Sequence, residues 1–371
     1  MRQVLITGGA GFIGSHLADQ LLQEGYRVRV LDSLVQQVHG QDQARPDYLS
    51  PDVDLIRGDV RDRDAVHRAL HGVDAVVHLA AAVGVGQSMY EIADYVAVND
   101  LGTAVLLEAL LKQPVGRVVV ASSMSVYGEG VGRTQAGLEV EPDERTLAQL
   151  RRGQWEPEGS GREPLAPLPT PESKRPALSS VYALNKFTQE RMCLLFGRAY
   201  DIPTTALRFF NVYGTRQALS NPYTGVLAIF GSRLLNGRAP MIFEDGQQRR
   251  DFVHVRDVAR ACAAALASDR SSGHAINVGS GVGRTVEEVA RSLARAVNRP
   301  DLHPQITGKY RAGDIRHCFA DIALAERLLG FRPQESFESG LAELAEWLAG
   351  RVATDRVDEA MTELARRGLV A

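Results

Sequence analysis

A cluster of glycines near the amino terminus restricts what this chain can fold into. The glycines at 8, 9, 11 and 14 follow an apolar run, precede a helical pattern and satisfy the spacing G-x-G-x-x-G. A tight strand-to-helix turn needs residues without a Cβ, and the free N–H groups of the helix's first turn bind phosphates. The alternative interpretation is a plain tight turn. The strand before and the helix after favour a dinucleotide-binding loop, whose candidate contacts are Gly8, Gly11, Phe12, Ile13 and Gly14.

The second expected strand, over residues 27–31, is followed directly by an acidic residue. Asp32 lies 18 residues after Gly14, where a carboxylate binds the ribose hydroxyls of the adenosine half of a dinucleotide. Because a carboxylate repels a 2′-phosphate, the pattern favours NAD over NADP.

Composition and charge exclude several classes of protein. With 371 residues, of which 44% are hydrophobic and 23% charged, the chain can bury a large core as a soluble protein does. The net charge of −3 gives no sign of a nucleic-acid or anionic-membrane partner. Three widely spaced cysteines suggest neither a disulfide framework nor a zinc cluster, so no metal is expected. The first residues enter a strand at once and no apolar run reaches ~18 residues, so we expect a reduced, cytoplasmic protein.

Strand and helix patterns alternate over residues 1–128. Strands are expected at 3–7, 27–31, 53–57, 74–78 and 116–121. Helices are expected at 12–24, 62–70, about 88–113 and, later in the chain, about 180–200. This alternation predicts an α/β fold in which a doubly wound parallel sheet carries helices on both faces.

Ligands of such a sheet bind at the carboxyl ends of its strands, so the loops after the strands are candidate site segments. Asp59 and Val60 follow the third expected strand and are candidates to contact the adenine of a dinucleotide. The alternative for this acidic residue is the N-cap of the next helix. Three further candidates follow the fourth strand, namely Leu79, Ala80 and Ala81.

Residues 129–178 interrupt the alternation. They hold seven of the sixteen prolines, and only Thr146–Arg152 has a helical pattern. An insertion of this length is either a functional lid or a mobile loop. Because it separates two candidate active-site segments, we favour a partly ordered excursion near the substrate entrance.

A tyrosine and a lysine begin the helix expected after this insertion. Tyr182 and Lys186 share a helical face, because side chains at i and i+4 are neighbours. A phenol with a reference pKa of about 10 is a poor base at neutral pH, but a nearby lysine and a nicotinamide cation favour its phenolate. Ser123, at the end of a strand, is placed to bond the same substrate hydroxyl. In isolation such a pair is usually a surface feature; here it predicts a reductase-type acid/base pair.

These and other motifs occur together in a known family. The first half of the chain contains Thr7-Gly-Gly-Ala-Gly-Phe-Ile-Gly14, His78-Leu-Ala-Ala81, Asn99, Ser122-Ser-Met-Ser-Val-Tyr-Gly128 and Tyr182-x-x-x-Lys186. The second half contains Arg208-Phe-Phe-Asn-Val-Tyr-Gly214, Arg250-Asp-Phe-Val-His-Val255 and Arg311-Ala-Gly-Asp314. With these motifs the chain resembles the extended short-chain dehydrogenases/reductases, specifically the NAD-dependent nucleotide-sugar epimerase/dehydratase family. The resemblance covers about 1–348 apart from the insertion.

The resemblance implies a role for each matched residue. Tyr182 would be the base, Lys186 would hold the nicotinamide ribose, and Ser123 would bind the sugar 4-hydroxyl. Asn99 would contact the cofactor, NAD. The remaining substrate contacts that it implies are Ser125, Asn211, Phe243, Arg250, Arg311, Asp314 and Cys318.

Within that set, the asparagine and the two arginines would bind the nucleotide pyrophosphate. Guanidinium groups make bidentate, charge-assisted contacts to phosphate oxygens, which agrees with this role. The alternative, a surface salt bridge, is credible for either arginine taken alone. Asp314 would lie beside the nucleotide ribose and Phe243 against the base, and Cys318 resembles a gate position that admits bulky 2-substituents when it is small.

Two positions favour one reaction of that family. Sugar 4,6-dehydratases carry an acidic pair between the strand-end serine and Val-Tyr-Gly, and decarboxylases keep a glutamate at the second position. Here those positions are Met124 and Ser125, and a methionine cannot transfer a proton. Oxidation of the sugar to a ketone followed by its reversal remains, so the sequence favours a 4-epimerase.

The sugar is less constrained. The insertion resembles that of bacterial dTDP-L-rhamnose 4-epimerases, but it lacks the cysteine pair that those enzymes commonly carry there. The resemblance of the insertion favours a dTDP-6-deoxyhexose as the substrate. Because the cysteine pair is missing, UDP-hexoses, UDP-N-acetylhexosamines and UDP-hexuronates stay as alternatives. An NAD(P)H-dependent sugar-ketone reductase and a catalytically silent NAD-binding regulator are the competing functions.

The resemblance also implies the domain organisation. We expect a Rossmann-type NAD-binding domain at 1–212, a smaller α/β nucleotide-sugar domain at 213–348 and a helical tail at 349–371. Segments such as 250–262 are candidates to return to the first domain. The helices near 88–113 and 180–200 resemble the family's four-helix dimer contact, so we expect a homodimer.

Overall fold

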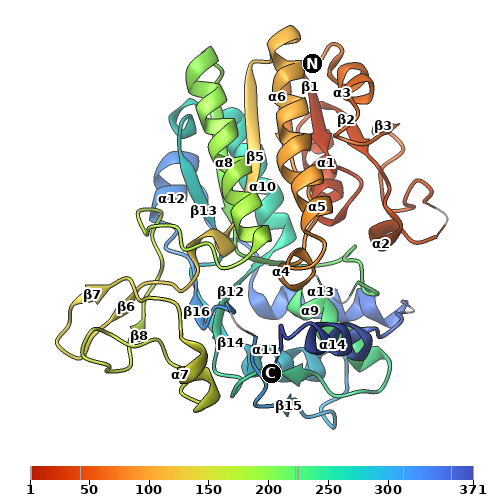
Figure 1. The fold of residues 1–371 in the computed structure, drawn as a ribbon. Coiled ribbons are helices and arrows are strands. Elements are labelled where there is room, and N and C mark those ends of the chain that lie inside the picture. Colours follow the sequence, from red (N-terminus) through yellow and green to blue (C-terminus); the bar gives the residue numbers. More distant parts are fainter. Residues whose placement is uncertain are drawn as a thin grey trace.

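The computed structural model describes residues 2–41, 43–221, 223, 225–311, 313–351 and 353–370. The chain forms two lobes (Figure 1). One is built on a seven-stranded parallel sheet between two layers of helices, and the other packs several helices around short strands. The doubly wound α/β fold predicted from the sequence is confirmed.

The large sheet has the strand order β13-β9-β5-β4-β1-β2-β3. Its strands are β1 Gln3–Thr7, β2 Arg27–Asp32, β3 Asp54–Arg57, β4 Ala75–His78, β5 Arg117–Ser123, β9 Thr204–Phe209 and β13 Ala275–Val278. From β1 the chain builds the sheet outward through β2 and β3 on one side and then through β4 and β5 on the other, so the strand order reverses between β1 and β4. Strand β1 is parallel to both β2 and β4. The loops after these strands therefore meet at one edge, which is where such sheets bind ligands.

Helices cover both faces of this sheet because the inner strands are apolar on both sides. One face carries α1 Phe12–Gln23, α10 Val255–Ala267 and α12 Ala323–Leu329. The other carries α3 Arg63–Leu70, α6 Gly102–Lys112 and α8 Val181–Tyr200. Short helical segments lie at α2 Gln36–His39, Met124–Tyr127 and Asp269–Ser271.

The segment expected to be one helix at 88–113 is divided. It contains α4 Val85–Ser88, α5 Ile92–Tyr95, a π-helical segment Val96–Leu101 and then α6. A π-helical segment widens the helix by one residue per turn and often marks a functional site. It includes Asn99, whose side chain is fully buried against the loop that follows β4.

The second lobe has its own apolar core. Its helices are α9 Val226–Leu235, α11 Val286–Ala296, α13 Phe337–Ala349 and α14 Val357–Arg366, and the core lies between the first three of them. Its strands are β10 Asn211–Tyr213, β11 Met241–Ile242, β12 Arg249–His254, β14 Gly283–Thr285, β15 Gln305–Ile306 and β16 His317–Cys318. Strand β12 lies between β10 and β14 and also pairs with β16, so residues far apart in the sequence meet beside it.

The proline-rich insertion is a small folded unit that extends beside the second lobe (Figure 1). It contains β6 Gly132–Arg133, β7 Glu139–Val140 and β8 Ala166–Pro167, which form a three-stranded sheet, and α7 Leu147–Arg151. The helix expected at Thr146–Arg152 is confirmed, with the Thr146 hydroxyl accepting the N-terminal bond from Gln149 N at 3.2 Å. None of the helices in the described ranges has the length and apolar character that crossing a membrane requires.

Candidate active site

The glycine loop between β1 and α1 lies so close to its neighbours that side chains do not fit. Gly8 has φ +68°, and a Cβ there would lie 2.9 Å from the backbone of Ala80. A Cβ on Gly14 would lie 2.5 Å from Gly9 Cα. The N-cap of α1 is Gly11, which has no side chain to accept a hydrogen bond from the first turn of the helix. The first-turn N–H groups of α1 therefore stay open to a phosphate ligand, which fits a dinucleotide.

Asp32 ends β2 beside this loop. Its carboxylate accepts hydrogen bonds from Ala10 N at 3.0 Å and from Leu34 N at 2.9 Å. The side chain is almost fully buried, and His39 Nε2 lies 3.6 Å from Oδ1. Asp32 thus holds the glycine loop from within and places a negative charge where an adenosine ribose is expected.

The alternative interpretation of Asp59, as the N-cap of the helix after β3, is wrong. The N-cap of α3 is Asp62, whose carboxylate accepts from Asp64 N at 2.9 Å. The Asp59 carboxylate instead accepts from Arg61 Nε at 2.9 Å, and this hydrogen bond lowers the pKa of Asp59. Val60 is buried in the core between the sheet and α3.

The loop after β4 brings Leu79, Ala80 and Ala81 next to the glycine loop. It is held from the π-helical segment, because Asn99 Oδ1 accepts from Ala82 N at 2.7 Å and Asn99 Nδ2 donates to Ala82 O at 3.1 Å. Both polar groups of the asparagine are thereby used on one residue of the loop. The predicted cofactor contacts of β1, β2 and β4 thus meet at one edge of the sheet.

Tyr182 stands in the first turn of α8. Its backbone N–H has no partner within the helix and donates to Ser88 Oγ at 3.0 Å. Ser180 is the N-cap of the helix, and its Oγ accepts from Ala183 N. Although its ring is partly exposed, burial of the hydroxyl raises the pKa of Tyr182 to about 12, and a hydrogen bond with Ser123 lowers it. Ser123 also accepts from Ser125 Oγ at 2.9 Å. The structure therefore brings together the tyrosine and both predicted serines.

Lys186 lies one turn further along α8, with its ammonium buried. Burial lowers the pKa of Lys186 to about 8, against the opposing influence of Cys193, Glu190 and Asp100. Its Nζ donates to Gln189 Oε1 at 2.8 Å. A lysine with this pKa is mostly protonated at neutral pH, so it presents a positive charge on the face of α8 that carries Tyr182.

Sequence reasoning missed Gln189 and the network behind it. Gln189 Nε2 donates to Thr103 Oγ1 at 2.9 Å, and this hydroxyl lies 2.9 Å from His78 Nε2. The opposite ring nitrogen, His78 Nδ1, lies 2.7 Å from Thr7 Oγ1. Burial lowers the pKa of His78 to about 3, so the ring is neutral at physiological pH. The i,i+3 spacing of Lys186 and Gln189 was the available signal.

In the second lobe, four predicted substrate residues meet at β12. Arg311 Nη2 lies 3.3 Å from Asp314 Oδ2, and its guanidinium lies 5.0 Å from the centre of the Phe243 ring. Arg250 Nη2 lies 3.9 Å from the other oxygen of Asp314. Burial raises the pKa of Asp314, but the charges of Arg311 and Arg250 outweigh this and lower it. Two cations thus flank a single carboxylate, and one of them also lies over an aromatic face.

Two polar atoms at this site have no protein partner among the described residues, namely Asn211 Oδ1 and Arg311 Nε. Buried polar atoms are normally paired, so both atoms favour a polar ligand. Ala312, in the Arg311–Asp314 motif, lies outside the described residues. Cys318 of β16 lies opposite Arg250 of β12 in a parallel strand pair. Its side chain is fully buried, and its Sγ lies 3.8 Å from Thr170 Oγ1.

Over the described ranges, no group of three or more His, Cys, Asp or Glu residues is arranged to hold a metal ion. The candidate site consists of a dinucleotide cradle, a Tyr–Lys–Ser set and a cationic, aromatic cluster of side chains. The first two come from the sheet lobe and the third from the second lobe, so a ligand that joins them lies between the lobes.

Comparison with known proteins gives matches over nearly the whole chain. The model of the "NAD dependent epimerase/dehydratase family" matches residues 4–148 and 159–279. The dTDP-L-rhamnose 4-epimerase of Burkholderia thailandensis is 35% identical over 353 residues, which cover 94% of this chain and 95% of that protein.

Two solved structures share the fold. The UDP-glucose 4-epimerase of Thermotoga maritima, solved with UDP-glucose, is 31% identical with a TM-score of 0.76, covering 94% of this chain and 98% of that one. The UDP-glucose 4-epimerase of Thermus thermophilus, solved with NAD, is 30% identical with a TM-score of 0.74, covering 94% of this chain and 100% of that one.

Proposed function

Because this chain belongs to the NAD-dependent epimerase/dehydratase family, as its motifs predicted, we propose that it is a nucleotide-sugar 4-epimerase. Its cofactor is NAD, as predicted. The observation that carries the proposal is an intact set of Tyr182, Lys186 and Ser123 beside positions that hold no acid. Met124 and Ser125 fill the places where dehydratases carry their acidic pair.

The geometry supports a proton relay at the sugar 4-hydroxyl. Ser123 bonds that hydroxyl, and Tyr182 accepts its proton as the sugar is oxidised to a 4-ketone. NAD, when bound, supplies the hydride acceptor and returns the hydride. Because burial leaves the phenol with a pKa of about 12, Tyr182 needs the positive charge of Lys186 nearby to act as a base at neutral pH. Rotation of the sugar and return of the proton from Tyr182 complete inversion at C4.

The second lobe supports a nucleoside diphosphate as the fixed part of the substrate. Arg250 and Arg311 are the cations for the pyrophosphate, and Phe243 offers a face for the base. We propose a dTDP-6-deoxyhexose such as dTDP-L-rhamnose, which is the substrate named for the Burkholderia relative. UDP-hexoses, UDP-N-acetylhexosamines and UDP-hexuronates are the alternatives.

Incubation of the purified enzyme with a panel of dTDP- and UDP-sugars, followed by chromatographic separation of epimers, tests both reaction and substrate. With the accepted sugar deuterated at C4, the product is expected to keep its label at C4, because the hydride stays in the site. Loss of label into free NADH, or steady accumulation of a ketone, identifies a dehydrogenase or reductase and contradicts the proposal.

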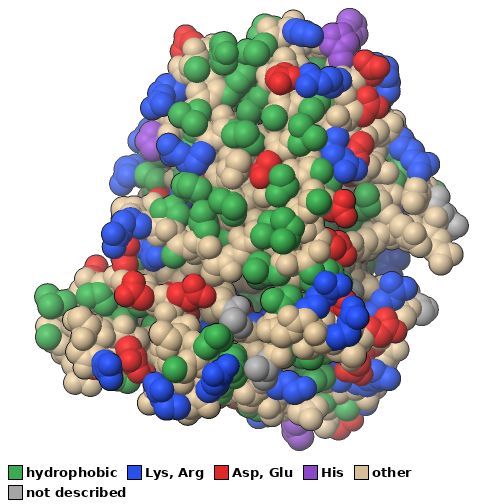
Figure 2. Space-filling view, in the orientation of Figure 1, with side chains coloured by type: hydrophobic (Ala, Val, Ile, Leu, Met, Phe, Trp, Pro, Cys, Tyr) green, Lys and Arg blue, Asp and Glu red, His purple; other side chains and the backbone are tan. Residues whose placement is uncertain are grey.

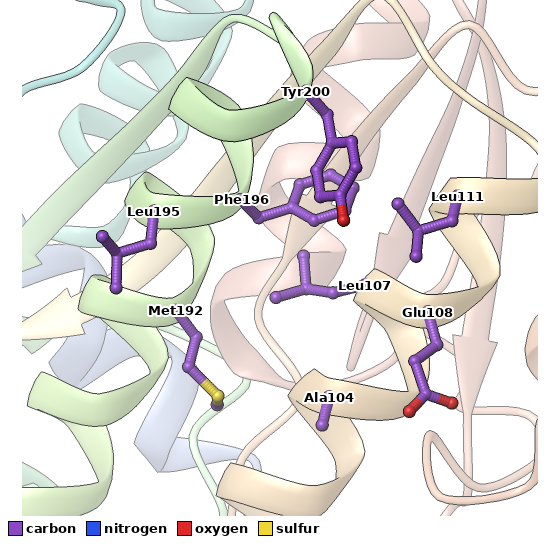
Figure 3. Close-up of a pocket in the computed structure, with 8 residues that line it drawn as sticks. All are labelled: Ala104, Leu107, Glu108, Leu111, Met192, Leu195, Phe196 and Tyr200. Atoms are coloured by element: carbon purple, nitrogen blue, oxygen red, sulfur yellow. The ribbon is translucent and has the colours of Figure 1, made fainter.

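We also propose that the enzyme is a homodimer. Figure 2 shows hydrophobic side chains gathered over α6 and α8, and Figure 3 shows them facing each other across a groove between these helices. The groove is lined by Ala104, Leu107, Glu108, Leu111, Met192, Leu195, Phe196 and Tyr200. Because Leu111 and Tyr200 are 50% and 55% exposed, a second copy that brings its own α6 and α8 here removes this apolar surface from water.

The division of labour along the chain follows from this proposal. Residues 1–212 bind NAD, 213–348 bind the nucleotide-sugar and 349–371 form a tail. Within 250–262, the stretch that belongs to α10 returns to the first lobe, and the stretch that belongs to β12 stays in the second. We further propose a cytoplasmic location, since Cys193, Cys262 and Cys318 are buried free thiols that fit a reducing compartment.

A further inference from the structure

The proline-rich insertion places a buried arginine against the second lobe. The Arg145 side chain is 2% exposed, and each of its nitrogens donates to a different partner. Nε donates to Glu129 Oε1 at 3.0 Å, Nη1 to Glu244 Oε1 at 2.8 Å, and Nη2 to the carbonyl oxygen of Asp314 at 2.8 Å. A fork of donors in fixed directions fixes its partners relative to one another.

These partners belong to two edges of the proposed nucleotide site. Glu244 directly follows Phe243, the expected contact of the base, and has the left-handed φ of +54°. Asp314 belongs to the loop that also carries Arg311. One guanidinium from the insertion therefore connects the base side and the phosphate side of the proposed nucleotide site.

A second buried arginine completes this ionic cluster of Glu129, Arg145, Glu156, Glu244, Asp245 and Arg316. Arg316, 1% exposed, donates from Nη1 to Glu244 Oε2 at 3.0 Å and from Nε to Glu156 Oε1 at 3.0 Å. Its own N–H donates to Glu129 Oε2 at 2.8 Å. Because each buried charge has a partner of opposite sign, removal of one leaves another unpaired.

We propose that Arg145 is a positioning residue through which the insertion sets the geometry, and so the affinity, of the nucleotide site. The inference rests on the proposed function, because that function makes Phe243, Arg311 and Asp314 nucleotide contacts. Arg145 is itself separated from the expected ligand by the residues that it holds. The insertion thus acts on nucleotide binding through the residues that contact the nucleotide and leaves the Tyr182 chemistry unchanged.

The test uses the NAD-loaded enzyme with UDP and dTDP as probes, measured by titration calorimetry, and steady-state kinetics with the accepted sugar. In Arg145→Met, we expect nucleotide binding to weaken and KM to rise by at least about tenfold, while kcat at saturation stays within about twofold. NAD content is expected to stay unchanged. Arg145→Lys keeps the charge but not the fork, so it should recover only part of the affinity.

A double variant keeps the test decisive where the single change unfolds the insertion. Arg145→Met with Glu129→Gln removes the charge that the single variant leaves unpaired, while the glutamine still accepts from Arg316 N. Arg133→Met is the matched control, because Arg133 lies in the same insertion but pairs with Glu139 at 3.0 Å in an exposed position. Its nucleotide affinity should equal that of the unaltered enzyme.

Two results overturn the proposal. One is unchanged nucleotide affinity in a folded Arg145→Met or double variant. The other is a parallel loss of kcat, NAD content and thermal stability in every Arg145 variant, which identifies a purely structural role. An unaltered enzyme that binds neither UDP nor dTDP contradicts the proposed function itself, and so is distinguishable from both.

Discussion

Lys186 Nζ donates a hydrogen bond to Gln189 Oε1 at 2.8 Å, one turn further along α8. The amide is neutral, so it holds the ammonium in place without cancelling its charge. Gln189 is itself fixed by Thr103, whose hydroxyl contacts the neutral ring of His78. This chain of buried polar groups connects the catalytic helix to the end of β4, beside the glycine loop.

The pH profile of kcat should depend on Gln189. Activity is expected to fall above about pH 8, where Lys186, with its pKa lowered to about 8 by burial, loses its proton and the Tyr182 phenolate loses its stabilising charge. Gln189→Met removes the acceptor of the ammonium, so this alkaline limb should move to lower pH. Gln189→Glu places a carboxylate there, so the limb should move to higher pH. Limbs that coincide in all three proteins contradict this role.

Removal of the Tyr182 hydroxyl tests the base. Tyr182→Phe keeps the ring but removes the proton acceptor, so kcat should fall by roughly 10²–10⁴-fold. NAD content, measured after denaturation of the purified protein, should stay the same. Tyr200→Phe is the control, because Tyr200 lies at the far end of the same helix and is 55% exposed. A Tyr182→Phe enzyme with normal kcat excludes Tyr182 as the base.

Stability in acid should depend on Glu156. Burial raises the pKa of Glu156, but hydrogen bonds from His317 and Arg316 and their charges outweigh this and lower it from 4.5 to about 2. The folded state therefore binds fewer protons than the unfolded state between these values. The contribution of Glu156 is fully present above about pH 4.5 and is lost as the pH falls through about 2.

Urea unfolding at pH 7, 5, 4 and 3 measures this contribution. Glu156→Gln should be less stable than the unaltered protein at pH 7, and the difference should shrink as the pH falls. Glu139→Gln, which alters an exposed carboxylate of the same insertion, should run parallel to the unaltered protein. A Glu156→Gln difference that stays constant with pH removes Glu156 from the acid response.

The apolar groove between α6 and α8 makes the oligomeric state testable. Sedimentation at micromolar concentration should show a dimer. Leu111→Glu with Leu195→Glu places two charges in the proposed contact and should give a monomer, because burial of an unpaired charge is unfavourable. Val282→Glu changes an exposed apolar residue elsewhere and should remain a dimer. A monomeric unaltered protein rules out this interface at that concentration.

Features that depend on neighbouring residues were predictable from the chain. The glycine spacing at Gly8–Gly14 follows from where a turn excludes a Cβ, and the seven strand and helix segments expected up to residue 78 and at 116–121 lie within two residues of those observed. Tyr182 and Lys186 share a face because helical geometry alone decides it. The same local motifs identified the family and its NAD cofactor, which the comparisons confirm.

The sequence pattern did not predict the contacts of a residue where several neighbouring residues compete for one role, or where segments far apart in the sequence meet. Asp59 and Asp62 are both able to cap α3, and only the path of the loop selects Asp62. Gln189 is 111 residues from His78, and Arg145 is 169 residues from Asp314, so neither contact leaves a periodic signal. Hydrophobic period and backbone sterics act over a few residues and can be read along the chain. The pairing of buried charges depends on which loops the packed sheet brings together, and that is settled only when the chain folds.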